Sequence, residues 1–341
     1  MKQNIPSFAN AINAHAREKR PFLFILDFDC SKPIVRFIDE INPDEILFNF
    51  RGFTNQPSRE AGHTHLPYSF SKSPMPFGKY KERFHRVKEE LLKGNSYLLN
   101  LTFPTAIETS LTLKEIFIRS NAPYKLLYNS KGGKAHQGLN GSGADFVVFS
   151  PESFVRIKNG VISSFPMKGT INAAIPNARK IILEDAKELA EHSTIVDLIR
   201  NDLNMVAGNV KLARFRYVES IKTHNSELLQ VSSEIKGKVK KELLCNYGEL
   251  LTRLLPAGSV TGAPKRKTVE IIKETEGYER GYYTGVFGYS DGETLESAVM
   301  IRFIEQNEKG LCFKSGGGIT IYSNPESEYR ELIDKVYVPF D

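Results

Sequence analysis

One segment near the middle of the chain limits the possible folds more than any other. Apolar and polar residues alternate from Phe154 to Phe165, which is typical of a β-strand. Pro166-Met167-Lys168-Gly169-Thr170 follows, and its proline and glycine predict a turn. The ranges 178–190 and 195–205 then predict helices. The chain therefore passes from sheet to helix at a lysine.

Lys168 allows two interpretations. Lysines are mostly exposed, so a solvated lysine in a turn is the more common case. A lysine at a strand end, between proline and glycine, can instead be a nucleophile when partial burial lowers the pKa of its amine. The pentapeptide alone leaves both open.

The remaining chain alternates predicted strands and helices. Strands are predicted at 22–28, 46–50, 96–103, 124–128, 146–149, 218–222, 228–236, 285–289, 298–303 and 311–314. Helices are predicted at 8–16, 32–38, 76–93, 111–120, 243–255 and 264–276. The glycine-rich range 131–143 lacks the Gly-x4-Gly-Lys-Ser/Thr pattern of a phosphate loop, so we interpret it as a hairpin tip.

Charged residues and glycines gather in the last third of the chain. Arg302 lies in a predicted strand, and three glycines, 316–318, follow the next one, where backbone N–H groups can approach a carboxylate. Asn324-Pro325 predicts a helix start, and Glu328, Glu331 and Lys335 then share one helix face. Two carboxylates on one face can bind a divalent cation, although such a face is more often simply solvated.

Composition limits the class of protein. The chain has 341 residues, enough for about two domains, and 25% are charged, as in ordinary globular proteins. Its three cysteines form no Cys-x-x-Cys pair, which favours a reducing cytoplasm over a disulfide framework or a zinc ribbon. No membrane span or signal peptide is predicted. The net charge is +6, but the basic run 236–241 lacks aromatic interleaving, so we expect a solvated hairpin or linker and no nucleic-acid partner.

Several separated motifs together resemble the chorismate-utilising enzyme family. They are Ser150 to Phe154, Pro166 to Thr170, Ala190 to His192, Ile195 to Leu203, Gly258 to Lys265, Gly285 to Tyr289, Ile301 to Phe303, Gly316 to Ile319, and Glu328 to Glu331 with Asp334-Lys335. No single motif is decisive, but their order over more than half of the chain is specific. The lysine in Pro-x-Lys-Gly-Thr is most similar to aminodeoxychorismate synthase component I, also called para-aminobenzoate synthase component I.

The resemblance implies a reaction and a set of roles. Chorismate and ammonia would give 4-amino-4-deoxychorismate for p-aminobenzoate and folate synthesis, with the ammonia supplied by a separate glutamine amidotransferase. Glu152 would be the general acid and Lys168 the covalent nucleophile. The remaining implied residues are Glu191, Glu331 and Glu328 for Mg²⁺, and Arg302, Lys335, Gly316, Gly317, Gly318, Thr261, Tyr283 and Thr170 for the substrate.

Two positions depart from the family pattern. Leu98 stands where aminodeoxychorismate synthases usually have glutamine and isochorismate synthases have a lysine base, and Gln230 stands where many members have histidine. Three alternatives therefore stay open: anthranilate synthase component I, a catalytically idle chorismate-binding subunit, and an unrelated metal-binding protein.

The resemblance also implies the fold. We expect an α+β protein with two mostly antiparallel sheets packed face to face, helices outside, and the active site in a central cleft. Residues 1–75 would form a strand-rich segment of a shortened N-terminal part. Residues 76–341 would form one interleaved catalytic region.

Overall fold

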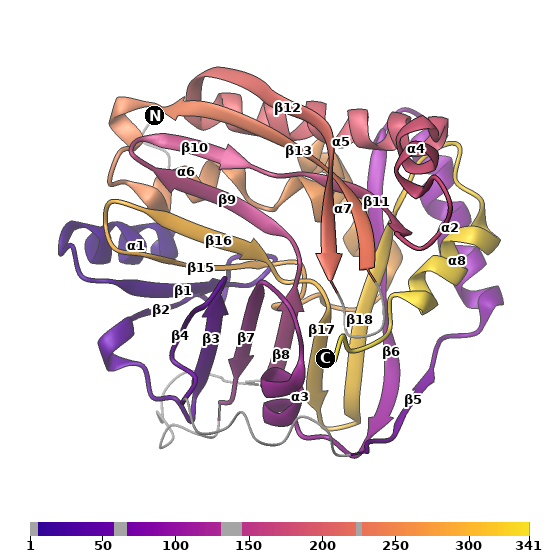
Figure 1. Cartoon of the computed structure of the whole chain (residues 1–341), viewed down its shortest axis with the longest axis horizontal. Helices are drawn as coiled ribbons and strands as arrows, with labels where there is room; N and C mark the ends of the chain where they lie inside the picture. The colour runs from indigo at the N-terminus through magenta and orange to yellow at the C-terminus, as the bar shows by residue number, and fades with distance from the viewer. Residues whose placement is uncertain (1–5, 58–66, 131–144, 223–226, 341) are drawn as a thin grey trace. The chain divides into compact units, whose positions relative to one another are not determined.

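The structure is a computed structural model that describes residues 6–57, 67–130, 145–222 and 227–340 (Figure 1). The predicted hairpin tip at 131–143 lies outside these residues. The chain forms two compact units. Unit 1 comprises residues 1–40, 152–259 and 284–299, and unit 2 comprises residues 41–151, 260–283 and 300–341. Their segments alternate along the chain, so neither 1–75 nor 76–341 coincides with one unit.

Unit 1 contains a nine-stranded sheet in which every strand pair is antiparallel. Its order is β11-β13-β10-β9-β16-β15-β1-β2, with β12 also paired to β13. The strands are β1 (Phe22–Leu26), β2 (Ile34–Phe37), β9 (Ser153–Lys158), β10 (Val161–Ser164), β11 (Met167–Asn172), β12 (Ala207–Lys222), β13 (Glu227–Val239), β15 (Val286–Ser290) and β16 (Leu295–Val299).

The helices of unit 1 are α1 (Ser7–Arg17), α4 (Ala178–Glu184), α5 (Ala186–Val206) and α6 (Tyr247–Leu254). The longest, α5, runs along β12 and β13 and also contacts β11 and α6 (Figure 1). Its buried side includes Ile195, Ile199 and Leu203, as the sequence periodicity predicts. Asp185 caps the start of the helix, and its side chain accepts a hydrogen bond from the Glu188 N–H.

Unit 2 contains a second nine-stranded antiparallel sheet, in the order β14-β6-β18-β17-β8-β7-β3-β4 with β5 beside β6. Its strands are β3 (Ile46–Phe50), β4 (Phe53–Thr54), β5 (Phe70–Ser73), β6 (Leu98–Thr109), β7 (Tyr124–Tyr128), β8 (Asp145–Ser150), β14 (Gly262–Ala263), β17 (Phe303–Asn307) and β18 (Gly310–Ile319). Its helices are α2 (Phe77–Leu92), α3 (Leu113–Arg119), α7 (Lys265–Glu276) and α8 (Pro325–Asp334).

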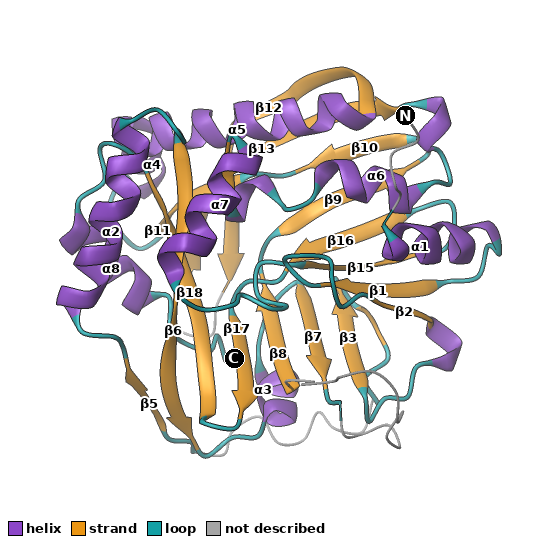
Figure 2. Ribbon diagram, turned by 180° about the vertical axis from the view of Figure 1, so that it is seen from behind, coloured by secondary structure: helices purple, strands orange, loops and turns teal. Residues whose placement is uncertain are grey.

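A buried cluster joins the helices of unit 2 to its sheet. Figure 2 shows α2, α7 and α8 beside β6 and β18. The cluster includes Tyr80 and Phe84 of α2, Leu99 of β6 and Ile271 of α7. The α+β fold with two antiparallel sheets is therefore confirmed. The face-to-face packing and the central cleft stay predictions.

Two predictions around the lysine segment are wrong. The run 154–165 is not one strand but the hairpin β9–β10, because Asn159 and Gly160 both have positive φ, 52° and 71°, which suits a two-residue hairpin turn. The pentapeptide is not a plain turn, because residues from Met167 onward belong to β11. A polar and small-residue stretch can still pair as a strand when a long neighbour such as β13 offers its backbone.

Four other segments also differ from prediction. The range 32–38 contains β2 instead of a helix, because alternating Ile34 to Phe37 pairs with β1. Arg302 lies between β16 and β17, not in a strand, and its φ is +53°. Gly316–Gly318 lie within β18, and the basic run 236–241 begins in β13 instead of linking two elements. In the described part of the chain, no helix combines the length and apolar character needed to cross a bilayer.

The close contact of α1 with α6 gives a stability prediction. A Cβ on Gly248 would lie 2.1 Å from the Ala9 carbonyl oxygen, which cannot move without shifting α1. We expect Gly248→Ala to lower the free energy of unfolding by about 1–3 kcal/mol or more, measured by urea titration. Gly208→Ala is the control in the same unit, because nothing lies within 4 Å of its Cβ position. Equal stability of the two variants would contradict this packing.

Candidate functional site

Lys168 lies at an irregularity in β11. Met167 pairs with Ser232 and Thr170 with Gln230, so the register shifts between them. Gly169 has a φ of +81°, which favours glycine. Bulges of this kind change the direction of a side chain. The Lys168 side chain is 28% exposed, so it is neither fully solvated nor sealed in the core.

Two carboxylates of α5 lie near Lys168. Its Nζ is 2.8 Å from Glu191 Oε2, and Lys187 lies 3.7 Å from the other Glu191 oxygen. Glu188 Oε2 is 3.1 Å from the Cβ position of Gly169, so glycine leaves room for this carboxylate. Burial raises the pKa of Glu188, which the positive charge of Lys168 opposes and the negative charge of Glu191 supports. Glu188 is a neighbour that the sequence interpretation missed.

His192 follows on the same helix and is buried. Its Nε2 lies 2.6 Å from the Ser233 hydroxyl, and burial, with the charges of Arg216 and Lys168, lowers its pKa to about 4. The ring is therefore neutral near pH 7. It supports the α5–β13 contact as a hydrogen-bonded side chain.

Glu152 lies between β8 and β9. Its backbone oxygen accepts a hydrogen bond from the Val299 N–H at 3.1 Å. Its carboxylate Oε1 accepts a hydrogen bond from the Ser259 hydroxyl at 2.5 Å. Hydrogen bonding to an ionised carboxylate stabilises that form. Sequence reasoning missed Ser259, although it lies in the glycine-containing motif before α7.

Unit 2 brings together four of the residues predicted for the substrate and the metal. Lys335 Nζ donates to the Gly316 carbonyl at 2.9 Å and lies 2.7 Å from Glu331 Oε1. Arg302 donates to the Lys335 carbonyl at 2.9 Å, and its guanidinium lies 5.0 Å from the Tyr337 ring centroid. Two cations therefore lie beside one end of β18.

The glycine run of β18 has one side without a strand neighbour among the described residues. Pairing with β17 ends at Lys314, whereas pairing with β6 continues to Ile319. Lys335 binds the Gly316 carbonyl, and in antiparallel pairing the N–H of a residue lies on the same side as its carbonyl. The N–H groups of Gly316 and Gly318 therefore lie on the side away from β6. This arrangement suits an anion.

The predicted metal ligands of unit 2 form a pair. Glu328 is buried, with Oε2 3.4 Å from the Cβ position of Gly317, and Glu331 is one turn further along α8. Over the residues that the structure describes, no three acidic, histidine or cysteine side chains are arranged to hold a metal ion. Magnesium often takes only one or two carboxylates and adds water and substrate oxygens. Glu328 and Glu331 could supply part of such a site, and Lys335 would compete with the metal ion for the Glu331 carboxylate.

Three other residues predicted to contact the substrate lie outside the group formed by Arg302, Gly316, Glu331 and Lys335. Thr261 is fully buried, and its carbonyl accepts a hydrogen bond from the Asn100 N–H at 2.9 Å. Tyr283 is buried against Phe303, and burial raises the pKa of its phenol. Thr170 of β11 is exposed.

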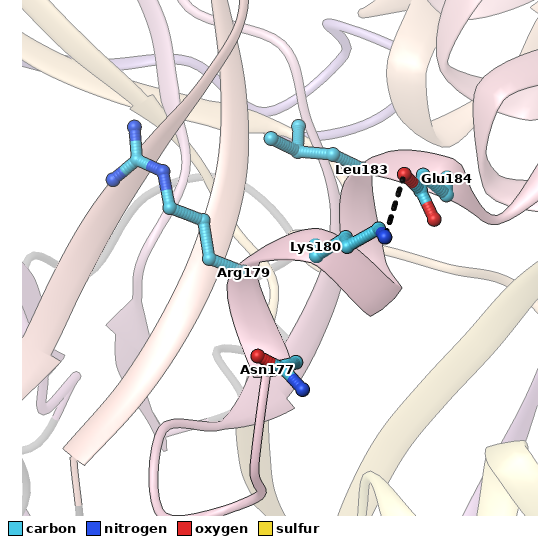
Figure 3. Close-up of a pocket in the computed structure, with 5 residues that line it drawn as sticks. All are labelled: Asn177, Arg179, Lys180, Leu183 and Glu184. Atoms are coloured by element: carbon cyan, nitrogen blue, oxygen red, sulfur yellow. Dashed lines mark ion pairs between the residues drawn. The ribbon is translucent and has the colours of Figure 1, made fainter.

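A surface pocket is found elsewhere, around α4 (Figure 3). It is lined by Asn177, Arg179, Lys180, Leu183 and Glu184, and Lys180 lies 3.9 Å from Glu184. None of the predicted site residues lines it. Because Arg179 and Glu184 are both exposed, we assign it no function.

Three relatives cover most of this chain. A PabA-like protein of Haemophilus influenzae is 46% identical over 98% of this chain and 97% of its own length. Anthranilate synthase component 1 of Archaeoglobus fulgidus is 31% identical over 76% of this chain and 60% of its own length. Aminodeoxychorismate synthase component 1 of Salmonella typhimurium is 29% identical over 90% of this chain and 66% of its own length.

The fold has a solved counterpart in a 2,3-dihydroxybenzoate-specific isochorismate synthase from Bacillus anthracis. The TM-score is 0.72 at 21% identity, covering 97% of this chain and 87% of the other, and at that identity it shows the fold alone. The family model described as chorismate binding enzyme matches residues 36–341. The chain therefore belongs to the chorismate binding enzyme family.

Proposed function

We propose that this protein is an aminodeoxychorismate synthase, a transferase that converts chorismate and ammonia to 4-amino-4-deoxychorismate for p-aminobenzoate and folate synthesis. The observation that carries the proposal is Lys168, half-buried at the β11 bulge and paired with Glu191 at 2.8 Å. The aminodeoxychorismate synthase of Salmonella typhimurium, 29% identical over 324 residues, supports the same choice. The three cysteines, all free thiols, favour the cytoplasm.

The covalent steps use two residues of unit 1. The Lys168 amine, once deprotonated, adds to ring C2. Both ring double bonds shift by one position, from C1=C2 to C1=C6 and from C5=C6 to C4=C5, as the C4–OH bond breaks. Glu152 gives its proton to the departing hydroxyl, so that water leaves. Ammonia then adds to C4, both ring double bonds shift back to C5=C6 and C1=C2, and the C2–N bond to Lys168 breaks. One poor displacement is thereby divided into two easier ones.

Neighbouring groups prepare both residues for these roles. Glu191, 2.8 Å from the Lys168 Nζ, positions this side chain, and the proton that the ammonium must lose passes to solvent, to which Lys168 is partly exposed. The Ser259 hydroxyl stabilises the carboxylate that Glu152 becomes after donating its proton. A general acid typically contributes about 10²–10⁴ in rate.

Unit 2 would bind the two carboxylates of chorismate. Arg302 can make a bidentate contact, whereas Lys335 acts as a point charge. The N–H groups of Gly316 and Gly318 add uncharged donors. Thr261 and Tyr283 of unit 2 and Thr170 of unit 1 are proposed as further substrate contacts.

We propose Mg²⁺ as the cofactor, held by Glu191 and Glu331, with Glu328 acting through water. Magnesium would supply positive charge to a substrate carboxylate. Glu191 and Glu331 now pair with Lys168 and Lys335, so each lysine would share its carboxylate or release it. A glutamine amidotransferase is the proposed ammonia source.

A second candidate function is anthranilate synthase component I. The relative from Archaeoglobus fulgidus carries that name and is 31% identical, slightly more than the aminodeoxychorismate synthase. A third possibility is an idle chorismate-binding subunit, which the departures at Leu98 and Gln230 allow. Leu98 is buried, with its Cδ1 3.2 Å from the Cβ position of Gly318, so an apolar group lies beside the glycine run.

The product distinguishes these candidates. We expect chorismate, Mg²⁺ and ammonia to give a non-aromatic product that becomes p-aminobenzoate only after aminodeoxychorismate lyase is added. Chromatography with mass detection follows both compounds. Anthranilate formed without lyase would replace the proposal with the second candidate. Calorimetric binding of chorismate with no product would favour the idle subunit.

The nucleophile is tested by trapping the adduct. Wild-type protein quenched with chorismate and Mg²⁺ but without ammonia should gain the mass of chorismate less one water at Lys168. Lys168→Ala should lose amination by at least about 10³-fold, because the two-step route is removed. Lys168→Arg, which keeps the charge beside Glu191, should also give no adduct. Full activity in Lys168→Ala would rule out the covalent route.

The metal ligands are tested by magnesium affinity. We expect Glu191→Gln and Glu331→Gln each to weaken Mg²⁺ binding by about 10–100-fold, a range also seen when supporting groups at metal sites are lost. Calorimetric titration with Mg²⁺ measures this without turnover. Glu326→Gln is the control, because this exposed carboxylate lies on the same helix and pairs with Lys81 at 3.7 Å. Unchanged affinity in both site variants would contradict the assignment.

A further inference from the structure

Unit 2 contains an ion pair that is almost completely buried. The side chains of Arg280 and Glu276 are 2% and 1% exposed. Nε of Arg280 is 2.8 Å from Glu276 Oε2, and one terminal nitrogen is 2.6 Å from Oε1, so the contact is bidentate. Removing two charges from water costs about as much as their attraction returns. Net stability is therefore a poor explanation for the pair.

The rest of the guanidinium connects two segments that are distant in sequence. Its second terminal nitrogen donates to the Val260 carbonyl at 2.8 Å. The first terminal nitrogen also donates to the Asn100 carbonyl of β6 at 2.6 Å. The Arg280 carbonyl in turn accepts the Tyr283 N–H at 3.2 Å. One side chain therefore holds the residue before Thr261, while its own backbone holds Tyr283.

Glu276 fixes the same part of β6. Its Oε1 accepts both the backbone N–H and the hydroxyl of Thr102, each at 2.8 Å. Thr102 pairs with Gly316 and Asn100 pairs with Gly318 on the neighbouring strand β18. The ion pair therefore lies directly behind the strand segment that supports the glycine run.

We propose that Arg280 is a positioning residue for the substrate-binding part of unit 2. It holds the Val260–Thr261 segment against β6 and keeps β6 in register behind Gly316 and Gly318. Only a planar fork with several donors can bind one carboxylate in two places and two carbonyls at once, which a lysine ammonium on a flexible stem cannot do. The inference depends on the proposed function only for the identity of the ligand, chorismate.

The first test replaces Arg280 by Lys, which keeps the charge and loses the fork. Deuterium exchange followed by mass spectrometry should show faster exchange in peptides covering 97–102 and 258–264. Calorimetry should show chorismate binding weakened by about tenfold or more, because a small displacement of binding groups is costly. KM should rise more than kcat falls, since Arg280 does not touch the reacting atoms.

A buried cation elsewhere in unit 2 provides a matched control. Lys125 is buried and donates to the Phe117 and Ser120 carbonyls at 2.7 and 2.9 Å. Lys125→Met should lower the melting temperature, while exchange in 97–102 and 258–264 and the affinity for chorismate stay at wild-type values. The double variant Glu276→Met, Arg280→Met covers the case in which Arg280→Lys does not fold, because apolar replacement of both partners is often tolerated.

The outcomes separate this proposal from the proposed function. Exchange at wild-type rates in 97–102 and 258–264 in the folded Arg280 variants would overturn the positioning role, whatever product the wild-type protein makes. If the Arg280 variants and Lys125→Met lost the same affinity for chorismate, the positioning role would also be overturned. General destabilisation of unit 2 would then be enough to explain the loss. Absence of aminodeoxychorismate from the wild-type protein would overturn the proposed function instead, and the exchange result would still decide the role of Arg280.

Discussion

The pairing of β6 with β18 is the interaction on which the candidate site in unit 2 depends. Nine consecutive residue pairs, from Leu311 opposite Ile107 to Ile319 opposite Leu99, fix the register. A slip by one residue would turn every side chain to the opposite face. The Gly316 backbone would then turn its carbonyl away from Lys335. Binding groups on a paired strand are therefore positioned by backbone hydrogen bonds, with little reliance on flexible loops.

Each unit contains a lysine of the candidate site that forms an ion pair with a glutamate. Lys168 is held by Glu191, and Lys335 is held by Glu331, at 2.8 and 2.7 Å. Each lysine is partly exposed, so its pair is cheap to separate compared with a buried one. Arg280, by contrast, is buried together with the Glu276 carboxylate, so this pair is costly to separate. The exchangeable pairs involve proposed reacting or binding groups, and the fixed pair supports the proposed binding groups of unit 2.

Much of this could be predicted from the sequence, and the exceptions have physical causes. The spacing of apolar residues predicts α2, α5 and most strands, because an element that is buried on one face repeats apolar residues at a fixed interval. It fails at Arg302 and at Lys168, where positive φ and a register shift are set by partners distant in the chain. Ser259 was missed because a single hydroxyl in a loop carries no pattern of its own. The family motifs predict roles for Glu152 and Glu331, but they do not predict that Ser259 hydrogen-bonds to Glu152 or that Lys335 pairs with Glu331.

The alternation of the two units along the chain has a consequence for synthesis. Strand β1 starts at Phe22, yet its neighbour β15 starts at Val286, and both lie inside one sheet. Such distant pairing raises the contact order, which slows folding. A ribosome must release nearly the whole polypeptide before either unit has all its strands. Strand β1 therefore has β2 available early but must wait for β15. Deleting residues 284–341 would remove strands from both sheets instead of removing one unit.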